Sequence, residues 1–394
     1  MKKRFGAGAM VSMWVFGFAV AVLCCTLVLA SKFGGAEAFS YTTKFAAVYK
    51  TISEKYVGEA DMEEISDAAY AAMVLATGDR WSRYMTAEEY ESYKLFQQNS
   101  YRGIGVTIRS AEEGSYPQVA EVVEDSPAQE AGVEIGDYFK ALEGEDLLGA
   151  SSEELKNKIA ALQDTEFSLT VLRGEQELEL TIKSGVVQSE PVEYELLADG
   201  TGYIRIKNFE ARAGESAVNA ANELAEQGAD AIVFDVRLNP GGLLSELITI
   251  LDFLLPEGDM FVSSDKDGNE TVRASDAEFL DLPLAVIVDE NTYSAAEFFA
   301  AALSEYDRAV LVGTHTTGKA RSQINIPLSD GSAVHLSVNR YLTPKRVDLS
   351  EAGGLAPDVE VPISDELWPY LYAGELPHES DEQLKAAISA LSRG

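Results

Sequence analysis

The sequence predicts an α/β domain that carries a small inserted β-rich domain, a helical N-terminal region and a single transmembrane helix. Three observations support this organisation. From about residue 202 onward the hydrophobic pattern alternates between strands and helices. Residues 101–185 show short alternating segments instead, and an uncharged stretch fills most of residues 1–31. The expected divisions are therefore 1–31, 40–100, 101–185 and 186–394.

The N-terminus is interpreted as a membrane anchor. Residues 2–4 are Lys-Lys-Arg, and residues 5–31 carry no charge. This run is long enough to cross a bilayer, which takes roughly 20 helical residues. The basic flank is expected to stay in the cytoplasm, which places the rest of the chain outside it.

Two other interpretations give the same location. Residues 28–30 (Val-Leu-Ala) form a tolerable signal-peptide cleavage site. A lipoprotein site at Cys24 is weaker, because Leu23 is too bulky for the small residue usual there. The uncleaved anchor is favoured, so the expected localisation is the cell membrane, single-pass, with everything after the anchor extracytoplasmic.

Composition excludes several classes of function. The chain has 65 acidic and 31 basic residues, a net charge of −34, and such a surface repels nucleic acid and anionic lipid. Its two cysteines, Cys24 and Cys25, both lie in the apolar run, which excludes disulfides, a thiol nucleophile and CxxC metal sites in the remainder. Three scattered histidines exclude a structural zinc site and a HExxH metalloprotease. No cofactor, metal or nucleic-acid partner is expected.

Residues 40–100 are expected to be helical. A second helix is expected over about 61–76, and Thr86 with Glu89 forms a capping box that begins a third. Apolar side chains recur on one face of the first helix at Phe45, Val48, Ile52 and Tyr56. Core packing explains these stripes.

The inserted domain is expected to be mostly strands. Its helix is capped by Ser151 with Glu154 and runs to about Leu162. The expected strands are 105–109, 119–123, 138–142, 168–172 and 177–182.

The last part of the chain is expected to form a largely parallel sheet with crossover helices. The expected strands are 203–207, 231–236, 284–288 and 309–312, with helices at 215–227, 243–255 and 295–306 and a hairpin of 323–328 with 333–341. Active sites of α/β domains gather at the carboxyl ends of strands. Three strand ends here carry unusual residues.

The first strand end leads to Ser294, at the start of a helix. As an N-cap, this serine would only satisfy helix N–H groups. As a nucleophile, it would gain from the helix dipole, and the N–H that follows would stabilise an oxyanion. Taken alone, the motif favours the cap.

The second strand end is the loop from Asp235 to Gly242, with Asn-Pro-Gly-Gly at its close. Paired glycines let the backbone approach a ligand closely and expose N–H groups at a helix start. A plain turn is the simpler interpretation. A phosphate site is weaker, because the chain has no GxxxxGK[ST] pattern.

The third strand end carries Lys319, and a lone lysine in a loop is usually a solvated charge. A hydrolase serine needs a base, however, and the chain has no GxSxG elbow. His315 and His335 come with no acidic orienter at a recognisable spacing. A lysine can act as this base if burial keeps its amine neutral. Pairs of a nucleophilic serine and a lysine base are known among hydrolases.

The segment from Ser294 to Gln323 resembles the C-terminal processing peptidases, also called tail-specific proteases. In that family the lysine base follows the nucleophilic serine by 25 residues, in a Gly-Lys pair, with a glutamine four residues further. Ser294, Lys319 and Gln323 reproduce that spacing, and Glu297 matches the glutamate of the serine motif. The loop from Arg237 to Gly242 resembles the family's oxyanion loop.

The resemblance implies a role for each of these positions. Ser294 is the expected nucleophile, Lys319 the base and Gln323 the residue that orients Lys319. The N–H of Ala295, with one from Gly241 or Gly242, is the expected oxyanion hole. The implied fold is a ClpP/crotonase-like peptidase domain. Two residues depart from the family's pattern: Ala296 replaces a serine, and Tyr293 adds bulk beside the nucleophile.

The inserted domain resembles a PDZ domain. Residues 126–128 (Ser-Pro-Ala) and 131–137 match its second half. Gly103, Ile104, Gly105 and Val106 resemble its carboxylate-binding loop. Such a loop captures a terminal carboxylate with backbone N–H groups, and the peptide adds a strand to the sheet edge.

The sequence thus predicts a membrane-anchored, extracytoplasmic serine endopeptidase that recognises flexible, apolar protein C-termini. Its expected partners are such proteins or peptides and the membrane, and the sequence leaves room for a homo-oligomer. Two alternatives stay open. One is a PDZ-type peptide-binding receptor that has lost activity, which Tyr293 favours. The other is a serine esterase with His315 or His335 as base.

Overall fold

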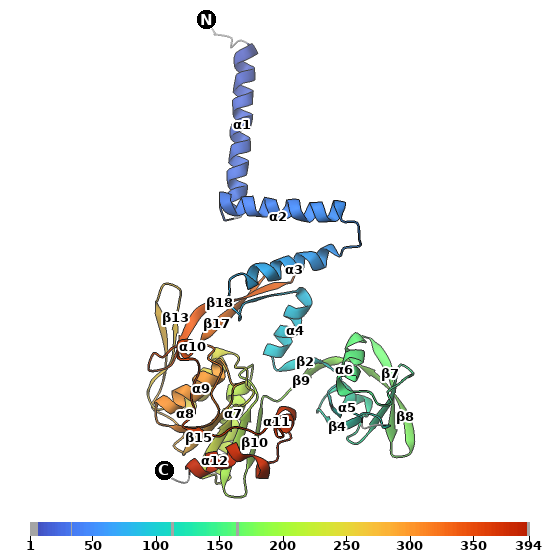
Figure 1. Ribbon diagram of the computed structural model, residues 1–394, viewed down its shortest axis with the longest axis vertical. Helices are drawn as coiled ribbons and strands as arrows, with labels where there is room; N and C mark the ends of the chain where they lie inside the picture. Colours follow the sequence, from blue (N-terminus) through green and yellow to red (C-terminus); the bar gives the residue numbers. More distant parts are fainter. Residues whose placement is uncertain (1–6, 33, 112–113, 163–164, 392–394) are drawn as a thin grey trace. The chain divides into compact units, whose positions relative to one another are not determined.

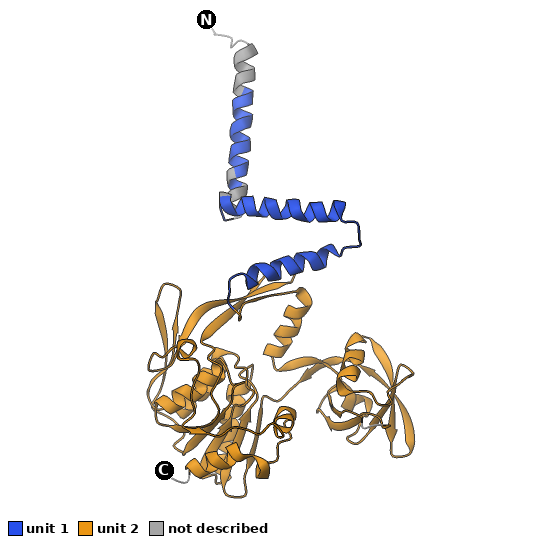
Figure 2. Cartoon of the chain, in the orientation of Figure 1, with its two compact units in different colours: residues 1–79 blue, residues 80–394 orange. Residues whose placement is uncertain are grey.

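The computed structural model describes residues 7–32, 34–111, 114–162 and 165–391. The chain divides into two compact units, residues 1–79 and residues 80–394 (Figure 2). The described part of the first unit is helical, with α1 (Ala7–Lys32), α2 (Ala36–Lys55) and α3 (Met62–Leu75). An Asp61 side chain caps α3 by accepting from the N–H groups of Glu63 and Glu64.

The structure corrects the expected transmembrane helix. Residues 7–32 are indeed helical, as α1. Among the residues that the structure describes, however, no helix combines the length and the apolar composition that crossing a membrane requires. The single transmembrane helix expected over residues 1–31 is therefore wrong. The basic flank at residues 2–4 lies outside the described residues.

The second unit contains the predicted β-rich domain, between residues 103 and 184 (Figure 1). Its sheet has the order β3-β4-β5-β7-β8, with β6 paired to β5. The strands are β3 (Val106–Arg109), β4 (Gln118–Val122), β5 (Tyr138–Leu142), β6 (Glu145–Asp146), β7 (Glu166–Arg173) and β8 (Gln176–Lys183), and the helices are α5 (Pro127–Ala131) and α6 (Ser152–Ala161). Its own apolar core includes Phe139, Phe167 and Leu155.

Two antiparallel strands join this domain to the rest of the unit. β2 (Ser100–Gly103) pairs with β9 (Gly185–Gln188), so the chain enters and leaves the domain side by side. Before β2 come β1 (Arg83–Met85) and α4 (Ala87–Gln97), and the Thr86–Glu89 capping box that begins α4 is present as predicted.

The main sheet has the order β10-β11-β12-β15-β16-β19, and all its pairings are parallel except that of β10 with β11. The strands are β10 (Val192–Leu196), β11 (Thr201–Ile206), β12 (Ala231–Asp235), β15 (Leu284–Val288), β16 (Ala309–Gly313) and β19 (Val359–Glu360). The predicted parallel sheet is therefore confirmed for its four expected strands. The antiparallel edge strand β10 was not predicted.

Helices cover both faces of this sheet. On one face, α7 (Ala213–Glu226), α8 (Leu244–Leu254) and α9 (Ala295–Glu305) share a large apolar core with alternate residues of the strands. On the other face, α12 (Glu382–Leu391) packs through Leu384 and Ala387. Strands buried on both faces need apolar residues throughout, which is why β15 reads Leu-Ala-Val-Ile-Val.

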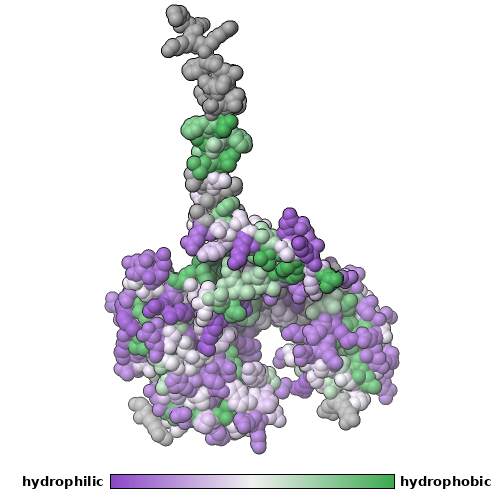
Figure 3. All heavy atoms as spheres, turned by 45° about the horizontal axis from the view of Figure 1, so that its top comes forward, coloured by the Kyte–Doolittle hydropathy of each residue, from purple (hydrophilic) through white to green (hydrophobic). Residues whose placement is uncertain are grey.

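The second unit also contains a second, five-stranded sheet. Its order is β1-β18-β13-β14, with β17 paired to β18. The predicted hairpin corresponds to β17 (Arg321–Pro327) and β18 (Ala333–Leu342), whereas β13 (Gly258–Ser264) and β14 (Glu270–Ser275) were not predicted. Short segments complete the C-terminal part: α10 (Leu349–Ala352), α11 (Trp368–Ala373) and a 3-10 turn at His378–Ser380. Hydrophilic residues are spread over the visible face of the second unit (Figure 3), in keeping with its acidic composition.

Candidate active site

Three neighbouring strands of the main sheet end at one edge. β12 lies beside β15 and β15 beside β16, and all three are parallel. The loops that follow them therefore meet, and they carry the glycine pair, Ser294 and Lys319. These residues line one cleft of about 700 Å³, which confirms the prediction that they gather at the strand ends.

Ser294 occupies the N-cap position of α9, and its side chain is buried. Its hydroxyl makes no cap hydrogen bond to the helix, whereas its backbone N–H donates to Glu297 Oε2 over 2.9 Å. Its φ of 59° lies in the left-handed region, which is strained for serine. The N–H of Glu297 donates to the backbone carbonyl of Ser294 at 2.9 Å, so it has an acceptor besides the hydroxyl, although the two residues have the pairing of a capping box.

Glu297 holds the backbone on both sides of the cleft. Its side chain is completely buried, and its carboxylate accepts four hydrogen bonds. Oε1 accepts from Thr316 Oγ1 at 2.5 Å and from the N–H of Gly318 at 2.7 Å. Oε2 accepts from the N–H groups of Ser294 at 2.9 Å and of Lys319 at 2.8 Å. One carboxylate therefore fixes the backbone of the expected nucleophile and of the expected base together.

Lys319 lies against two aromatic rings. Its Nζ is 4.6 Å from the ring centroid of Trp81 and 5.5 Å from that of Tyr293. The two rings stack on each other, with centroids 5.8 Å apart. Tyr293, the bulky departure from the family pattern, thus forms one wall beside Lys319. Burial of the hydroxyl raises the pKa of Tyr293 above its ordinary value.

Gln323 lines the same cleft as Lys319. Its amide nitrogen donates to Arg321 O at 3.1 Å and to Ser337 Oγ at 2.9 Å. These bonds fix the Gln323 side chain on β17 and β18. Its role in orienting Lys319 stays a prediction.

The two glycines of the oxyanion loop differ in one respect. The N–H of Gly241 donates to Asn239 Oδ1 at 2.8 Å and is therefore already used. Phe209 and Gly242 form an isolated β-bridge, in which the N–H of Phe209 donates to Gly241 O and the N–H of Leu243 donates to Phe209 O. The N–H of Gly242 takes part in no hydrogen bond among the described residues. Of the pair left open by the sequence, Gly242 has the available donor.

Both positions also require glycine. A Cβ on Gly241 would lie 2.8 Å from the nitrogen of Ala295 and 2.8 Å from Ser294 Cβ. Gly242 has a φ of 153°, and a Cβ there would lie 2.3 Å from the carbonyl carbon of Phe209. The loop consequently packs directly against the start of α9. The N–H of Ala295 points out of the first helical turn, where it has no intrahelical acceptor.

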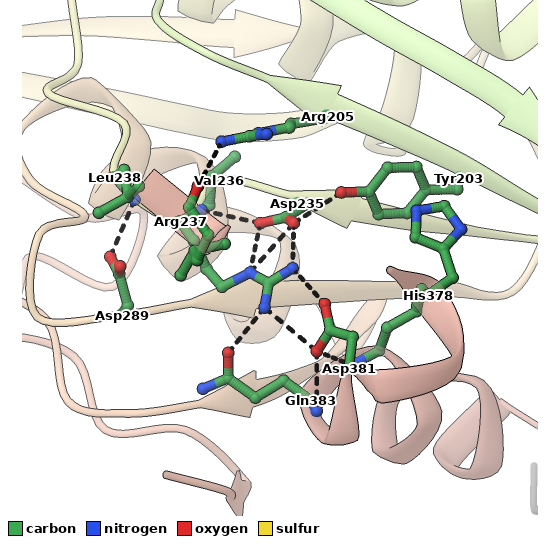
Figure 4. Close-up of polar contacts among 12 residues, drawn as sticks. Tyr203, Arg205, Asp235, Val236, Arg237, Leu238, Asp289, His378, Asp381 and Gln383 are labelled. Carbon is green, nitrogen blue, oxygen red and sulfur yellow. Dashed lines mark hydrogen bonds and ion pairs between the residues drawn. The ribbon is translucent and has the colours of Figure 1, made fainter. Parts of the chain in front are cut away.

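A buried ionic network holds this loop from the other side (Figure 4). The guanidinium group of Arg237 bonds to Asp235 at 2.5 Å and to Asp381 at 2.7 Å, and it donates to Gln383 Oε1 at 2.9 Å. Tyr203 donates its hydroxyl to Asp235 at 2.8 Å. Asp381 and Gln383 stand at the start of α12, so this helix anchors the residue that precedes the glycine loop.

Asp289 joins the first two strand-end loops. Its Oδ1 accepts from the N–H of Leu238 at 3.1 Å, as Figure 4 shows, and from Thr292 Oγ1 at 3.0 Å. These hydrogen bonds lower the pKa of Asp289, but burial of the carboxyl has the larger effect and raises it to about 6.

The two histidines considered as bases differ in position. His335 lines the cleft, but its Nδ1 is 2.7 Å from the amide oxygen of Asn325, and its ring meets Tyr93 edge-on. His315 is exposed and is not among the residues that line the cleft. An amide does not stabilise an imidazolium as a carboxylate does, so the geometry favours Lys319 over either histidine.

The residues expected to hold a peptide terminus also come together. Gly103, Ile104, Gly105 and Val106 line a groove of about 680 Å³ together with Leu155 and Ile159 of α6. The exposed edge of β3 and the apolar residues of α6 give the groove both backbone donors and an apolar floor.

Glu210 is a cleft residue that the sequence analysis missed. Its side chain is only 4% exposed, and its Oε2 has no hydrogen-bond partner in the described part of the chain. Burial and the nearby Glu246 raise the pKa of Glu210 to about 7, although the charge of Lys319 acts in the opposite direction. One signal was available: Glu210 follows the carboxyl end of β11, which is a fourth strand end on the same side.

Comparisons with known proteins agree with these observations. Residues 200–361 match the family model of peptidase family S41, and residues 103–184 match that of the PDZ domain. The carboxyl-terminal-processing protease of Synechocystis sp. is 31% identical over 87% of this chain and 81% of its own length. The probable CtpA-like serine protease of Staphylococcus saprophyticus is 29% identical, and the chain spans 65% of its length. The fold resembles that of a photosystem II D1 C-terminal processing protease, with a TM-score of 0.50 and 24% identity over 89% of this chain and 93% of the other.

Glu210 makes stability depend on pH. Ionising this carboxyl is easy in the unfolded chain, where its pKa is about 4.5, and difficult in the folded protein, where it is about 7. The free energy of unfolding should therefore fall as pH rises from 4.5 through 7, by about 3 kcal/mol from this group. We expect Glu210→Gln to remove that part of the fall.

Urea unfolding at pH 5 and pH 8 measures the effect. The exposed Glu215→Gln provides the matched control, since it removes a carboxyl from the solvated side of α7. An equal fall in stability for both variants would contradict the assignment.

Proposed function

The chain belongs to peptidase family S41, among the carboxyl-terminal processing serine proteases, and from this premise we propose that Ser294 is its nucleophile and Lys319 its general base. We further propose that the enzyme is an endopeptidase that acts on proteins with flexible, apolar C-termini. The observation that carries the proposal is the Glu297 carboxylate, which binds the backbone N–H groups of both Ser294 and Lys319.

The proposed reaction uses groups that line one cleft. The Ser294 hydroxyl attacks the scissile carbonyl carbon while neutral Lys319 accepts its proton. The N–H groups of Gly242 and Ala295 stabilise the negative charge on the carbonyl oxygen. Lys319 then donates its proton to the departing amine, which leaves an acyl-enzyme. Water, deprotonated by Lys319, then attacks the ester carbon, and Lys319 returns the proton to the Ser294 oxygen as the C–O bond breaks and the acid product leaves.

The groove of the β-rich domain supplies binding. An apolar C-terminus would add as a strand to β3, with its carboxylate at the loop of residues 103–106 and its last side chain against Ile104 and Leu155. A tail held there keeps the chain upstream of it close to the protein, which raises its effective concentration at the cleft. Flexibility is needed because the segment must be extended in both places.

The inactive-receptor alternative finds less support. It requires loss of the catalytic groups, whereas Ser294, Lys319 and Gln323 are all present and line one cleft. Tyr293 is the residue that favoured it. Since the Tyr293 ring stacks on Trp81 in the wall beside Lys319, its bulk is accommodated.

We also propose that the protein works outside the cytoplasm. The support is the N-terminal sequence, in which basic residues precede an uncharged run, as in export signals. A fusion of alkaline phosphatase, which is active only after export, to the C-terminus of the chain tests this proposal. Phosphatase activity that disappears when residues 1–32 are deleted is expected, and a fusion that stays inactive with the full chain would contradict it.

Loss of either member of the dyad should abolish cleavage. We expect Ser294→Ala and Lys319→Ala to lower kcat by at least about 10³-fold, because each removes a group that acts in every turnover. Lys266→Ala, an exposed lysine on the loop between β13 and β14, is the matched control and should retain activity. The assay follows cleavage of a protein with a disordered, apolar tail. Full activity of Lys319→Ala would exclude this lysine as the base.

A further inference from the structure

The cleft carries the opposite charge to the protein around it. The whole chain has 65 acidic and 31 basic residues. Among the residues that line the cleft, by contrast, one carboxylic acid, Glu210, stands against three arginines, Arg80, Arg83 and Arg321. Lys319 lines the cleft too, but it is neutral in the proposed mechanism and is not counted.

The three arginines are not neutralised by neighbouring carboxylates in the described part of the chain. Arg80 lies over the ring of Trp81 at 4.3 Å, and Arg83 lies over the ring of Tyr93 at 5.3 Å. The arginines that do form ion pairs lie elsewhere, at Arg109, Arg173, Arg212, Arg237 and Arg346. A guanidinium group on an aromatic face keeps its outward N–H donors available.

The single acid does little to offset these charges. The Glu210 side chain is 4% exposed, so its carboxyl is withdrawn behind the wall of the cleft. Its pKa of about 7 also means that a large share of it is neutral at neutral pH. The potential in the cleft is therefore set by the three arginines, which stay charged when Lys319 is neutral.

Such a cleft has a defined effect on an approaching chain. A recess lined by one sign of charge concentrates field lines and raises the local concentration of oppositely charged ligands. The net charge of the whole chain, −34, repels an acidic segment. The contrast directs acidic side chains to the cleft itself, where guanidinium groups bind carboxylates with paired hydrogen bonds.

We propose that the cleft selects cleavage sites that carry Asp or Glu side chains within a few residues of the scissile bond. The inference rests on the proposed function, since it assigns a substrate class to the same cleft. It adds a second determinant, acidic and near the bond that is cut, to the apolar terminus held by the β-rich domain.

The arginines have a second effect that must be separated from this one. Positive charges near Lys319 favour its neutral form, so they would help any substrate equally. Charge selection, in contrast, changes the ratio of rates between acidic and neutral substrates. The ratio is thus the quantity to measure.

The experiment uses two peptide substrates with the same apolar C-terminal tail. One carries Asp and Glu around the cleavage site, and the other carries Asn and Gln at those positions. For the full-length enzyme we expect kcat/KM to be at least about tenfold higher for the acidic peptide at low ionic strength, with the ratio falling as salt screens the charges.

Charge-removing variants locate the effect. Arg80→Gln, Arg83→Gln and Arg321→Gln should each lower the ratio, and the triple variant should bring it close to one. Arg273→Gln, an exposed arginine on β14, is the matched control and should leave it unchanged. Arg321→Glu should move the preference toward a third peptide that carries lysines.

The outcomes separate the two proposals. Equal cleavage of the acidic and neutral peptides by the unaltered enzyme would overturn the charge selection but leave the proposed function standing. An equal loss of kcat/KM on both peptides in the arginine variants, with a shift of the acidic limb of the pH–rate profile, would also overturn it. That result would show that the arginines act by keeping Lys319 neutral. Failure to cleave any peptide with an apolar tail would count against the proposed function itself.

Discussion

The buried carboxylate of Glu297 is the interaction on which the site depends. An ionised carboxyl inside a protein is costly unless its oxygens are satisfied, and here four donors satisfy them. Two of these donors are the backbone N–H groups of Ser294 and Lys319, which lie 25 positions apart in the chain. The carboxylate also lies in the first turn of α9, where the helix dipole favours negative charge. One group therefore adds a direct link between the nucleophile and base positions to the pairing of β15 with β16, which already brings the two loops together.

The sheet and the Arg237 network supply the frame around that group. Parallel strands bring three loops to one edge, and α8 and α9 share a large apolar core with these strands. On the opposite face, α12 presents Asp381 and Gln383 to Arg237. A buried ion pair of this kind contributes little net stability but strongly opposes any rearrangement that would separate its charges. The glycine loop is thus fixed between Arg237 on one side and the start of α9 on the other.

Much of this arrangement could be predicted from local signals. The hydrophobic period located the strands of the main sheet, and the spacing of Ser294, Lys319 and Gln323 predicted residues that line one cleft. What escaped prediction depends on contacts between distant residues. Asp381 meets Arg237 across 144 positions, and Trp81 stacks on Tyr293 from a segment far upstream. Hydropathy gives no sign of either contact.

Two further points show the limits of sequence patterns. A single hydrogen bond distinguishes Gly241 from Gly242 as a candidate oxyanion donor, because the N–H of Gly241 already donates to Asn239 Oδ1. The expected transmembrane helix rested on the absence of charge over residues 5–31, and the described helices do not meet the length and hydropathy needed for a span. Absence of charge is a weaker criterion than sustained apolar composition.

The most direct test of the account is the reactivity of Ser294 when Glu297 is altered. Glu297→Ala removes both acceptor oxygens, which leaves the backbone N–H groups of Ser294, Gly318 and Lys319 without this acceptor. The measurement is the rate at which a fluorophosphonate labels Ser294, located by peptide mass spectrometry, in protein whose thermal unfolding remains cooperative. The account predicts labelling slowed by about 10²-fold or more. Labelling of the folded variant at the unaltered rate would show that Glu297 does not hold the dyad together.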